Sequence, residues 1–431
     1  MKINHLYQIF QLHPQITIDS RNCAENSLFF ALKGDNFDGN NFAETALNNG
    51  CAFAVVDNKK MVKDERYILV KDVLQTLQKL ANYHRNQLKT KIIAITGTNG
   101  KTTTKELIAA VLAKKYNTLF TQGNFNNHIG VPLTLLRLTA EHEIAVVEMG
   151  ANHLGEIKML SEMVEPDFGL ITNIGKAHLE GFGSFEGVLA AKTELYEFIR
   201  EQHKGRIFIN NCNENLVNAS NGILNISYGI NSNADVSGHI IEQNPLVTLA
   251  WASQRFSVTA EKIPTNLVGT YNAENLLAAI SVGLFFDVET KDICDALKEY
   301  APQNHRSQFI KTDKNSLIVD AYNANPTSME AALTNFAAIQ FPHKSVILGD
   351  MLELGEESEN EHKKVVENLQ KYNFDNVFLI GEIFAKINSD YKNFKNIDEF
   401  TAFLQQNPIE NSTILLKGSN GIKLEKTLEI L

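Results

Sequence analysis

The stretch IIAITGTNGKTTTKE, residues 92–106, has the residue types and spacing of a loop that binds nucleotide phosphates. A short apolar run leads into a glycine-containing turn, and Gly-Lys-Thr opens a predicted helix. Backbone N–H groups from Gly97 to Lys101 can face phosphate oxygens at the start of this helix. The Lys101 ammonium would neutralise the terminal phosphates, and the Thr102 hydroxyl would ligate Mg²⁺. The usual G-x-x-x-x-G-K-[ST] pattern has its first glycine where this chain has Ile95, so an ordinary strand–turn–helix unit remains the alternative.

Two further polar residues follow predicted strands, and the strand ends of an open α/β sheet are where its ligands bind. Glu148, in AVVEMGANHLGEI, lies at the end of a predicted strand, 144–149. A carboxylate beside a phosphate loop is a typical Mg²⁺ ligand, and a solvated acid at a strand end is the alternative. His178, in LITNIGKAHLEGFGS, follows the predicted strand 168–173. A single histidine is more often a hydrogen-bonded structural residue, so spacing alone does not make His178 a ligand.

Lys192, in VLAAKTELY, lies on an alanine-rich face of the predicted helix 185–200. A buried ammonium without a partner is costly. Spacing alone therefore favours a lysine that extends to solvent or pairs with Glu194.

These residues need a scaffold, and the pattern of apolar runs predicts an α/β one. From residue 92 onward strands alternate with helices, which is typical of a mostly parallel sheet. The predicted strands are 27–32, 52–56, 67–70, 92–96, 144–149, 168–173, 206–209, 316–320, 345–348, 376–380 and 413–416. The predicted helices are 73–88, 101–114, 185–200, 272–284, 291–300, 327–339, 358–371 and 421–430. A polar section that favours β structure covers 225–263, and 301–308 has the composition of a connector.

The chain has 431 residues, of which 44% are hydrophobic and 21% charged. This length predicts about three domains of roughly 150 residues each. The formal net charge of −10 argues against a general nucleic-acid binder. The four cysteines form no CxxC pair, which is typical of reduced thiols in a cytoplasmic protein. The N-terminus lacks the apolar core of a signal peptide, and no stretch approaches the ~18 apolar residues of a membrane span, so we expect a cytoplasmic protein without membrane insertion.

Many segments, in order along the chain, resemble the Mur ligase family of ATP-dependent peptide-forming enzymes. The segment DSRNCAENSLFFALKGDNFDGNNFAETALNNG (19–50) resembles the UDP-binding start of two late ligases of that family. The segments TGTNGKTTTKE, GNFNNHIGVPLTLL, EMGANHLGEI and AHLEGFGSFEGVLAAKTE resemble its central ATPase domain. The segments DAYNANPTSM, LGDMLELG and LLKGSNG resemble its C-terminal domain, in the form typical of the member that adds D-alanyl-D-alanine.

The resemblance runs essentially from end to end and implies an α/β fold of three domains. Residues 1–84 would form a small UDP-substrate-binding domain, and residues 85–300 a central P-loop ATPase domain with a mostly parallel sheet. Residues 301–431 would form a Rossmann-like domain that binds the amino substrate and closes on ATP. The implied reaction joins D-alanyl-D-alanine to UDP-N-acetylmuramoyl-tripeptide through an acyl phosphate, the last cytoplasmic step of the peptidoglycan pentapeptide precursor. The protein is expected to be a monomer that binds small molecules and no nucleic acid.

The implied cofactors are ATP and two Mg²⁺ ions. Lys192 would carry a carbamate made with CO₂ and help to hold the second ion, and the other metal ligands would be Thr102, Glu148 and His178. The implied catalytic residues are Lys101, Lys192, His178 and Arg306. The residues expected at ATP are Gly97, Thr98, Asn99, Gly100, Lys101, Thr102, Thr103, Asn275 at the adenine, Arg306 at the γ-phosphate and Asp320 at the ribose.

The residues expected at the other substrates come from two parts of the chain. They are Ser20, Arg21, Lys33, Asp38, Gly39, Asn126, Asn127, Tyr322, Asn323 and Asn325. For Asn126 and Asn127 a turn-forming role is the alternative. Two positions depart from the family pattern: Asn40 stands where many relatives have histidine, and Asn420 where many have arginine.

Three other functions are compatible with a phosphate loop in this setting. A sister ligase that adds the third amino acid shares most of the motifs. A folylpolyglutamate synthase shares the central domain, but the UDP-like segment 19–50 argues against it. A P-loop ATPase switch would turn over nucleotide without small acceptors, whereas a ligase needs both of its substrates.

Overall fold

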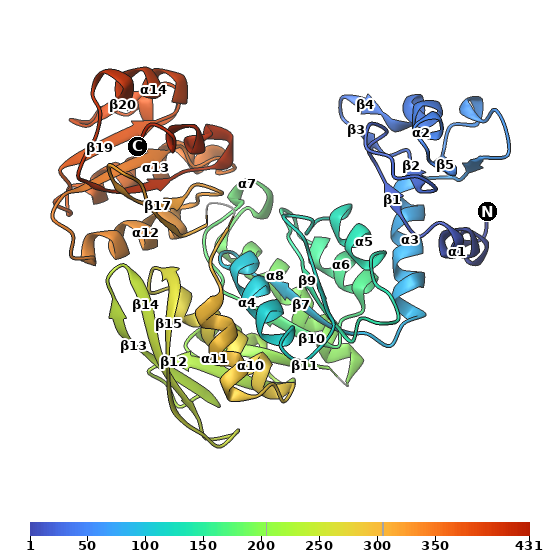
Figure 1. Cartoon of the computed structure of the whole chain (residues 1–431), viewed down its shortest axis with the longest axis horizontal. Helices are drawn as coiled ribbons and strands as arrows, with labels where there is room; N and C mark the ends of the chain where they lie inside the picture. Colours follow the sequence, from blue (N-terminus) through green and yellow to red (C-terminus); the bar gives the residue numbers. More distant parts are fainter. Residues whose placement is uncertain (204, 304–305) are drawn as a thin grey trace.

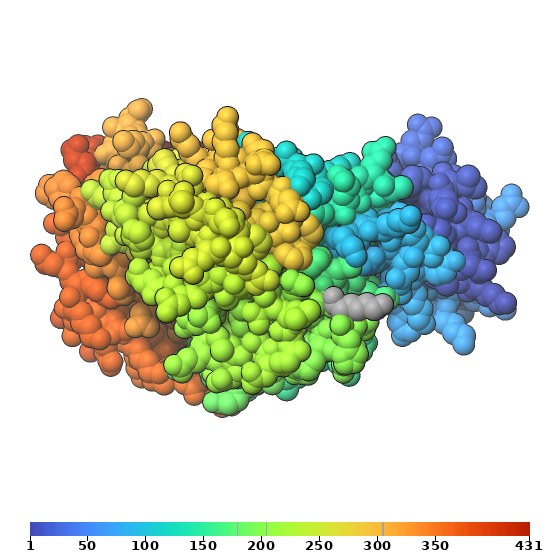
Figure 2. All heavy atoms as spheres, turned by 90° about the horizontal axis from the view of Figure 1, so that it is seen from below, coloured from blue at the N-terminus to red at the C-terminus, as the bar shows by residue number. Residues whose placement is uncertain are grey.

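The computed structural model describes residues 1–203, 205–303 and 306–431, which form three domains around three main sheets (Figure 1). Figure 2 shows the N-terminal and C-terminal domains at opposite ends of the molecule, with the central domain between them. None of the described helices is long and apolar enough to cross a membrane. The predicted α/β class with mostly parallel sheets in three domains is confirmed.

The N-terminal domain has a four-stranded parallel sheet in the order β1-β2-β5-β6. These strands are β1 (Ile16–Thr17), β2 (Leu28–Phe30), β5 (Phe53–Val56) and β6 (Tyr67–Leu69), and a separate pair comprises β3 (Lys33–Gly34) and β4 (Phe37–Asp38). The helices are α1 (Ile3–Leu12), η1 (Gly39–Phe42), α2 (Ala43–Asn48), η2 (Lys59–Met61) and α3 (Val73–Asn86). Helix α3 leads into the central domain, and the Asp72 side chain caps its first turn by accepting from the Gln75 N–H.

The central domain has a nine-stranded sheet in the order β15-β14-β13-β12-β11-β10-β7-β9-β8. Its strands are β7 (Lys91–Thr96), β8 (Thr118–Phe120), β9 (Ile144–Glu148), β10 (Phe168–Ile171), β11 (Arg206–Asn210), β12 (Leu224–Ile230), β13 (Val236–Gln243), β14 (Leu246–Ser253) and β15 (Val258–Val268). The part from β8 to β13 is parallel, and β14 and β15 extend it in antiparallel fashion. The section 225–263, predicted to favour β structure, supplies most of this extension.

Helices cover both faces of the central sheet, so its middle strands are apolar throughout. They are α4 (Lys101–Leu112), α5 (Gly130–Leu135), α6 (Glu156–Val164), α7 (Leu179–Phe182), α8 (Phe185–Gln202), α9 (Glu214–Ala219), α10 (Asn272–Phe285) and α11 (Thr290–Glu299). In β7, Ile92 and Ala94 join the core shared with α6 and α8, whereas Ile93 and Ile95 join the core shared with α4 and α10. This double burial fixes the position of the loop that follows β7.

The C-terminal domain has a six-stranded sheet in the order β16-β17-β21-β18-β19-β20, in which only the edge strand β16 is antiparallel. Its strands are β16 (Gln308–Lys311), β17 (Ser316–Asp320), β18 (Lys344–Gly349), β19 (Asn376–Ile380), β20 (Lys392–Phe394) and β21 (Thr413–Lys417). The helices are α12 (Pro326–Ala338), η3 (Gly355–Glu357), α13 (Ser358–Leu369), η4 (Phe384–Lys386) and α14 (Ile397–Gln406). Register pairs Asp320 with Lys417, so these two polar residues end adjacent parallel strands at one edge of the sheet.

The prediction of a helix at 421–430 is wrong. The chain there forms two short 3₁₀ helices, η5 (Asn420–Ile422) and η6 (Leu424–Thr427), separated by Lys423 with a φ of +62°. An α-helix cannot pass through a left-handed residue. The apolar residues that suggested a helix are instead used to bury Leu424 and Leu431 against the sheet.

Candidate functional site

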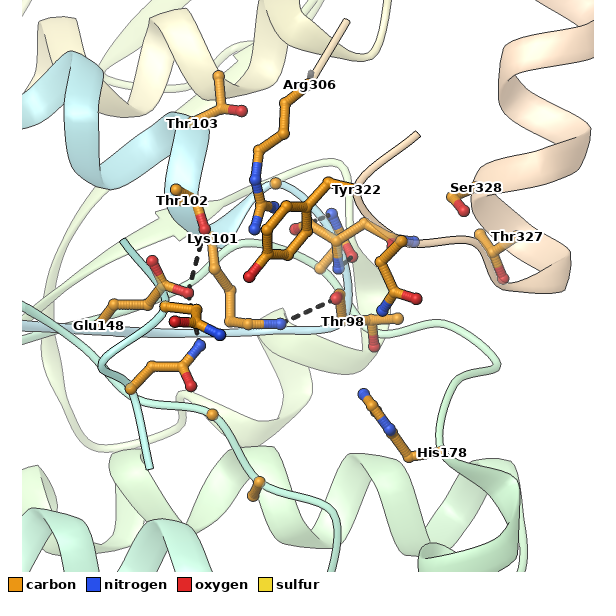
Figure 3. A pocket seen from close by; sticks show the side chains of 18 of the residues that line it. Thr98, Lys101, Thr102, Thr103, Glu148, His178, Arg306, Tyr322, Thr327 and Ser328 are labelled. Carbon is orange, nitrogen blue, oxygen red and sulfur yellow. Dashed lines mark hydrogen bonds between the residues drawn. The ribbon is translucent and has the colours of Figure 1, made fainter. Parts of the chain in front are cut away.

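A cavity of about 760 Å³ opens between the central and C-terminal domains (Figure 3). Residues from both domains line it. Many of the lining residues were predicted at ATP, metal or substrates. From the central domain these are Thr98, Asn99, Gly100, Lys101, Thr102, Thr103, Asn126, Asn127, Glu148, His178 and Asn275. From the connector and the C-terminal domain they are Arg306, Asp320, Tyr322 and Asn323. The structure therefore brings together most of the residues predicted around a nucleotide.

The phosphate loop connects β7 to α4 and uses glycine at two positions with positive φ. Gly97 has a φ of +141°, and a Cβ there would lie 2.0 Å from the Thr172 Oγ1 atom. Gly100 has a φ of +78° and precedes the first residue of α4. The Asn173 carbonyl accepts from the Thr98 N–H at 2.9 Å, so the end of β10 fixes the loop from the side. Glycine is needed at 97 rather than 95 because residue 95 is still inside the buried strand.

Lys101 folds back onto its own loop. Its Nζ atom donates to the Gly97 carbonyl at 2.8 Å. It also donates to the Thr98 carbonyl at 3.0 Å (Figure 3). Burial lowers the pKa of this lysine, the nearby Arg306 lowers it further, and Glu148 opposes the shift. Two cations held next to each other in a cavity create a local site for anions in a protein that is acidic overall.

Glu148 is buried at the end of β9, with 1% of the side chain exposed. Its Oε1 atom accepts from the Thr102 hydroxyl at 3.2 Å and from the Asn126 amide at 2.8 Å. Its Oε2 atom has no hydrogen-bond partner among the described residues. A buried carboxylate whose second oxygen accepts no hydrogen bond from the described residues and faces only a lysine at 3.5 Å can still accept a cation, and its burial shows that the solvated-acid alternative is wrong.

Lys105 is a residue at this site that the sequence analysis missed. It lies one turn after Lys101 on α4 and is fully buried, with its Nζ atom 3.5 Å from the Glu148 Oε2 atom and 3.4 Å from the Gly123 carbonyl oxygen. Its neighbours along α4, Thr104 and Leu107, are also buried. A lysine in phase with the buried face of a helix was the signal that could have revealed it.

Lys192 is 2% exposed on α8 and does not line the cavity, so it does not extend to solvent. Its Nζ atom donates to the Ala151 carbonyl at 3.2 Å and lies 5.0 Å from the centre of the Phe182 ring. Glu194 does not form the predicted pair, because its carboxylate accepts from the Gly155 and Lys158 backbone N–H groups. Burial, with a contribution from Lys101, lowers the pKa of Lys192 to about 7.

His178 has a φ of +50° and contacts the other domain rather than the phosphate loop. Its Nδ1 atom lies 2.9 Å from the Oε2 atom of Glu353 in the C-terminal domain. This contact holds the pKa of Glu353 below its ordinary value. The residues predicted as metal ligands are thus only partly brought together, and no cluster of three or more His, Cys, Asp or Glu side chains that could hold a metal occurs in the described ranges.

Arg306 and Tyr322 approach the phosphate loop from the C-terminal side. The guanidinium carbon of Arg306 lies 3.7 Å from the centre of the Tyr322 ring, a stacked cation–π geometry (Figure 3). The Arg306 Nε atom has no hydrogen-bond partner among the described residues. The guanidinium face of Arg306 is therefore held by the Tyr322 ring, and the N–H groups along its edge are left for a hydrogen-bond acceptor.

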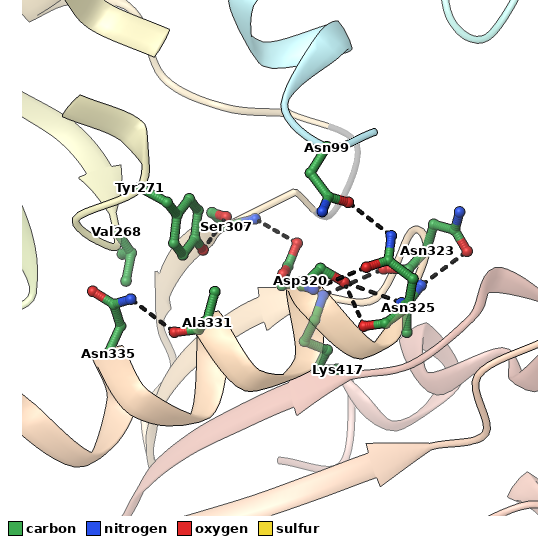
Figure 4. A network of polar contacts seen from close by, with 12 residues as sticks. Asn99, Val268, Tyr271, Ser307, Asp320, Asn323, Asn325, Ala331, Asn335 and Lys417 are labelled. Atoms are coloured by element: carbon green, nitrogen blue, oxygen red, sulfur yellow. Dashed lines mark hydrogen bonds and ion pairs between the residues drawn. The ribbon is translucent and has the colours of Figure 1, made fainter. Parts of the chain in front are cut away.

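The remaining predicted residues of the C-terminal domain belong to a polar network beside the cavity (Figure 4). Asp320 accepts from the Lys417 ammonium at 2.7 Å, and the Asn323 side chain accepts from the Ala324 N–H. Asn325 caps α12 and donates to the Asn99 side chain of the phosphate loop at 2.8 Å. Asn325 thus joins the two domains directly.

Three central-domain asparagines have defined contacts. Asn126 holds Glu148, as described above, whereas the Asn127 side chain accepts from the Ile129 and Gly130 N–H groups at the start of α5. Asn127 therefore has the turn-forming role that was its alternative, although it also lines the cavity. Asn275 accepts from the Thr104 hydroxyl at 3.0 Å, which orients it beside the loop.

The five residues predicted at the uridine diphosphate lie apart from this cavity, in the N-terminal domain. Lys33 pairs with Asp57 at 2.8 Å, and Asp38 caps η1, in which Gly39 is packed against the backbone of residues 31–32. Ser20 is buried, and the Arg21 side chain is exposed and paired with Asp19.

Asn40, at the position where relatives carry histidine, is buried in the same network. Its amide donates to both Asp38 and Asp57, and its oxygen accepts from the Asp57 backbone N–H. The asparagine links the two carboxylates that surround Lys33.

Comparison with known proteins covers nearly the whole chain. Residues 14–98 match the model of the Mur ligase family catalytic domain, residues 95–283 the Mur ligase middle domain, and residues 305–420 the Mur ligase glutamate ligase domain. The UDP-N-acetylmuramoyl-tripeptide–D-alanyl-D-alanine ligase of Bacillus subtilis is 35% identical over 99% of this chain and 95% of its own length.

Two solved structures have the same architecture. MurF from Acinetobacter baumannii superposes with a TM-score of 0.86 at 32% identity, over 96% of this chain and 92% of that one. MurF ligase from Thermotoga maritima, crystallised in complex with ADP, gives a TM-score of 0.84 at 25% identity over 96% of both chains. With its motifs, its three domains and these relatives in agreement, the chain belongs to the Mur ligase family.

Proposed function

We propose that this protein is an ATP-dependent ligase that joins D-alanyl-D-alanine to UDP-N-acetylmuramoyl-tripeptide. The observation that carries the proposal is the cavity between two domains, in which the phosphate loop faces Arg306 and Asp320. The names of the relatives that share the whole chain supply the substrates. A nucleotide bound on one side of such a cavity would meet a substrate carried on the other.

ATP would bind with its phosphates on the loop from Gly97 to Thr103. Backbone N–H groups at the start of α4 and the Lys101 ammonium would neutralise the phosphates. Arg306 would contact the γ-phosphate through its free edge, Asn275 would contact the adenine, and Asp320 the ribose. The ADP in the relative from Thermotoga maritima supports a nucleotide in this part of the fold.

The donor set fits magnesium. Oxygen ligands are those that Mg²⁺ prefers, and beside the phosphate site Thr102 and Glu148 offer a hydroxyl and a carboxylate oxygen that accepts no hydrogen bond from the described residues. When bound, the ion would neutralise charge that develops on the transferred phosphoryl group. His178 and a carbamate on Lys192 would hold a second ion.

The surroundings of Lys192 support a carbamate. The amine must be neutral to attack CO₂, and burial already lowers the pKa of this lysine to about 7. A carbamate would replace the cation with an anion, which would be compatible with a neighbouring cation such as Lys101.

The reaction would proceed in two steps. A carboxylate oxygen of the tripeptide attacks the γ-phosphorus of ATP, the bond to the β-phosphate oxygen breaks, and ADP leaves. The amine of D-alanyl-D-alanine then attacks the carbonyl carbon of the acyl phosphate, loses a proton, and expels inorganic phosphate. Lys101 and Arg306 would stabilise the charge of phosphoryl transfer between two anions, and the closed cavity would keep water from the acyl phosphate.

The UDP moiety would bind to the N-terminal domain, at Ser20, Arg21, Lys33, Asp38 and Gly39. Lys33 and Arg21 would face the diphosphate charge. Asn126 and Asn127 would line the nucleotide or sugar pocket. Tyr322, Asn323 and Asn325 would line the side from which the amino substrate enters.

We further propose domain boundaries after residues 84 and 300, a monomeric state and a cytoplasmic location. The ends of the elements bracket these boundaries: β6 ends at Leu69 and β7 begins at Lys91, with residue 84 in the last turn of α3, and α11 ends at Glu299 while β16 begins at Gln308.

The test is release of phosphate from ATP with UDP-N-acetylmuramoyl-tripeptide, with D-alanyl-D-alanine, with both, or with neither. Release that requires both, together with a product heavier by one dipeptide, is the expected result. If the enzyme instead adds a single amino acid to UDP-N-acetylmuramoyl-dipeptide, the result would assign the activity of the sister ligase that adds the third amino acid. Release with neither substrate, unchanged when they are added, would contradict the ligase function.

A further inference from the structure

Ser307, in the connector before the C-terminal domain, is held in an unusual backbone conformation. Its φ is +50°, a region that residues with a Cβ rarely occupy. Its backbone N–H donates to Asp320 Oδ1 at 3.3 Å, and its hydroxyl lies 2.8 Å from the Tyr271 hydroxyl (Figure 4). A strained left-handed residue persists only where its surroundings hold it, and these two contacts do so.

Lys417 holds the carboxylate of Asp320 in place, and the position of Ser307 depends on that carboxylate. It is 1% exposed at the end of β21, and its Nζ atom donates to Asp320 Oδ2 at 2.7 Å and to the Asn323 carbonyl at 3.3 Å. The two Asp320 oxygens are thus divided, one for Lys417 and one for Ser307. Lys417 fixes the carboxylate that fixes the connector.

Arg306 immediately precedes Ser307, so the backbone at 307 determines where the arginine is presented. The Arg306 guanidinium stacks on Tyr322 within the cavity, near enough to Lys101 to lower the pKa of that lysine. Tyr271 belongs to the central domain, whereas Asp320 and Lys417 belong to the C-terminal domain. Contacts from both sides of the cavity therefore converge on the residue next to Arg306.

We propose that Lys417 and Tyr271 are positioning residues that hold Ser307 left-handed and thereby aim Arg306 at the phosphoryl group being transferred. This inference rests on the proposed function. Lys417 acts through Asp320, and Tyr271 acts through the Ser307 hydroxyl, so the two residues reach Arg306 by separate contacts.

The experiment is a double-mutant cycle in the complete ligase reaction. Arg306→Ala is expected to lower kcat by at least ~10³-fold, as for other arginines that stabilise phosphoryl transfer. Lys417→Met is expected to lower kcat by ~10²-fold, because a displaced catalytic group costs about that much. In the Arg306→Ala background, Lys417→Met should change kcat by less than about threefold, since the group it positions is already gone.

Two outcomes would overturn the proposal. One is a double variant whose loss equals the product of the two single losses, which would show that Lys417 acts independently of Arg306. The other is a Lys417→Met protein with kcat within about twofold of the wild type. Lys426→Met, which removes a lysine from an exposed ion pair with Asp398, is the matched control and should leave kcat unchanged.

Tyr271→Phe provides an arm that leaves the buried ion pair intact. It removes only the hydroxyl contact to Ser307 and is expected to lower kcat ~10-fold, again without further effect in the Arg306→Ala background. If thermal unfolding shows that Lys417→Met does not fold, Tyr271→Phe alone tests whether Arg306 is positioned through Ser307. Absence of turnover in the wild type with both substrates would refute the proposed function instead, so the two failures are distinguishable.

Discussion

At the scale of single residues, the site is characterised by buried groups whose hydrogen bonding is incomplete. Glu148 has one carboxylate oxygen that accepts no hydrogen bond from any described residue and only faces Lys105 at 3.5 Å, and Lys192 has a single carbonyl acceptor in an apolar surrounding. Native proteins satisfy nearly all of their buried polar groups, so incomplete ones indicate a missing ligand or modification. Glu148 contacts Thr102 of the phosphate loop, and Lys192 contacts Ala151, which lines the same cavity, so both lie where a ligand is expected.

Lys192→Ala tests the modification. We expect the variant to lose at least ~10²-fold in kcat, because the second cation site would lack its anion, and to regain activity with formate or acetate. Wild-type enzyme should gain activity from added bicarbonate, and the variant should not. Full activity of Lys192→Ala without additives would contradict a carbamate at this position; Lys158→Ala, at an exposed lysine on α6, is the control.

Sequence reasoning found the residues whose role depends on local pattern, such as Lys101 and Glu148. It missed Lys105, and although Lys417 lies in the LLKGSNG segment, the sequence indicated no role for it. Both lysines are buried by elements far away in the chain, β9 for Lys105 and β17 for Lys417. From sequence alone a lysine is assigned to the surface, because the residues that bury it lie far away in the chain.

At the scale of elements, the phosphate loop depends on glycine at residue 97. We expect Gly97→Ala to lower the free energy of unfolding by roughly 1–3 kcal/mol and to raise the KM for ATP, because the new Cβ would clash with Thr172. Thermal unfolding and steady-state kinetics measure the two effects. Gly222→Ala is the matched control, since Gly222 also has a positive φ (+79°) but has open space around it. Equal effects of the two substitutions on the KM for ATP would contradict this account.

Helix α3 contains a histidine whose burial predicts how stability varies with pH. His84 bonds to the Leu138 carbonyl at 2.9 Å, and desolvation lowers its pKa. Between this lowered pKa and the unfolded value of about 6.5, the unfolded chain binds more protons than the folded one. The free energy of unfolding should therefore fall as the pH drops below about 6.5.

Urea unfolding of the wild type and of His84→Gln between pH 5 and 8 measures this dependence. The variant should show a shallower decline in stability on acidification. His5→Gln, at an exposed position on α1, should retain the full decline. A steeper decline in His84→Gln would show that burial of this histidine is not the cause.

Strands and long helices were predictable because their apolar periodicity is local. The wrong helix at 421–430 has suitable spacing, but Lys423 adopts a left-handed conformation that only tertiary packing selects. Helices α1, α6 and α14 were not predicted, although each buries an apolar face at helical spacing, so the periodicity was present in the sequence and was overlooked.

At the scale of the whole molecule, the proposed sites for the UDP substrate and for ATP lie on different domains and should be separable by mutation. Lys33→Ala is expected to raise the KM for the UDP substrate by ~10-fold, the order of one charge-assisted hydrogen bond. The KM for ATP should change by less than about twofold, because the phosphate loop belongs to another sheet. Lys63→Ala, in an exposed ion pair with Glu44, is the control from the same domain. A matching rise in the KM for ATP would contradict separate sites.

The contacts that hold Ser307, through Asp320 and Lys417, also have a consequence for the order in which the enzyme is synthesised. Arg306 and Lys417 are separated by 111 residues (417 − 306), so at ~5–20 residues per second a ribosome delivers the lysine roughly 5–20 s after the arginine. During that interval β7, β9 and β10 have already emerged, and the nascent chain can complete its phosphate loop. An unfinished polypeptide would thus bind nucleotide while Arg306 still lacks the lysine proposed to position it, and on that proposal chemistry begins only when synthesis of β21 is complete.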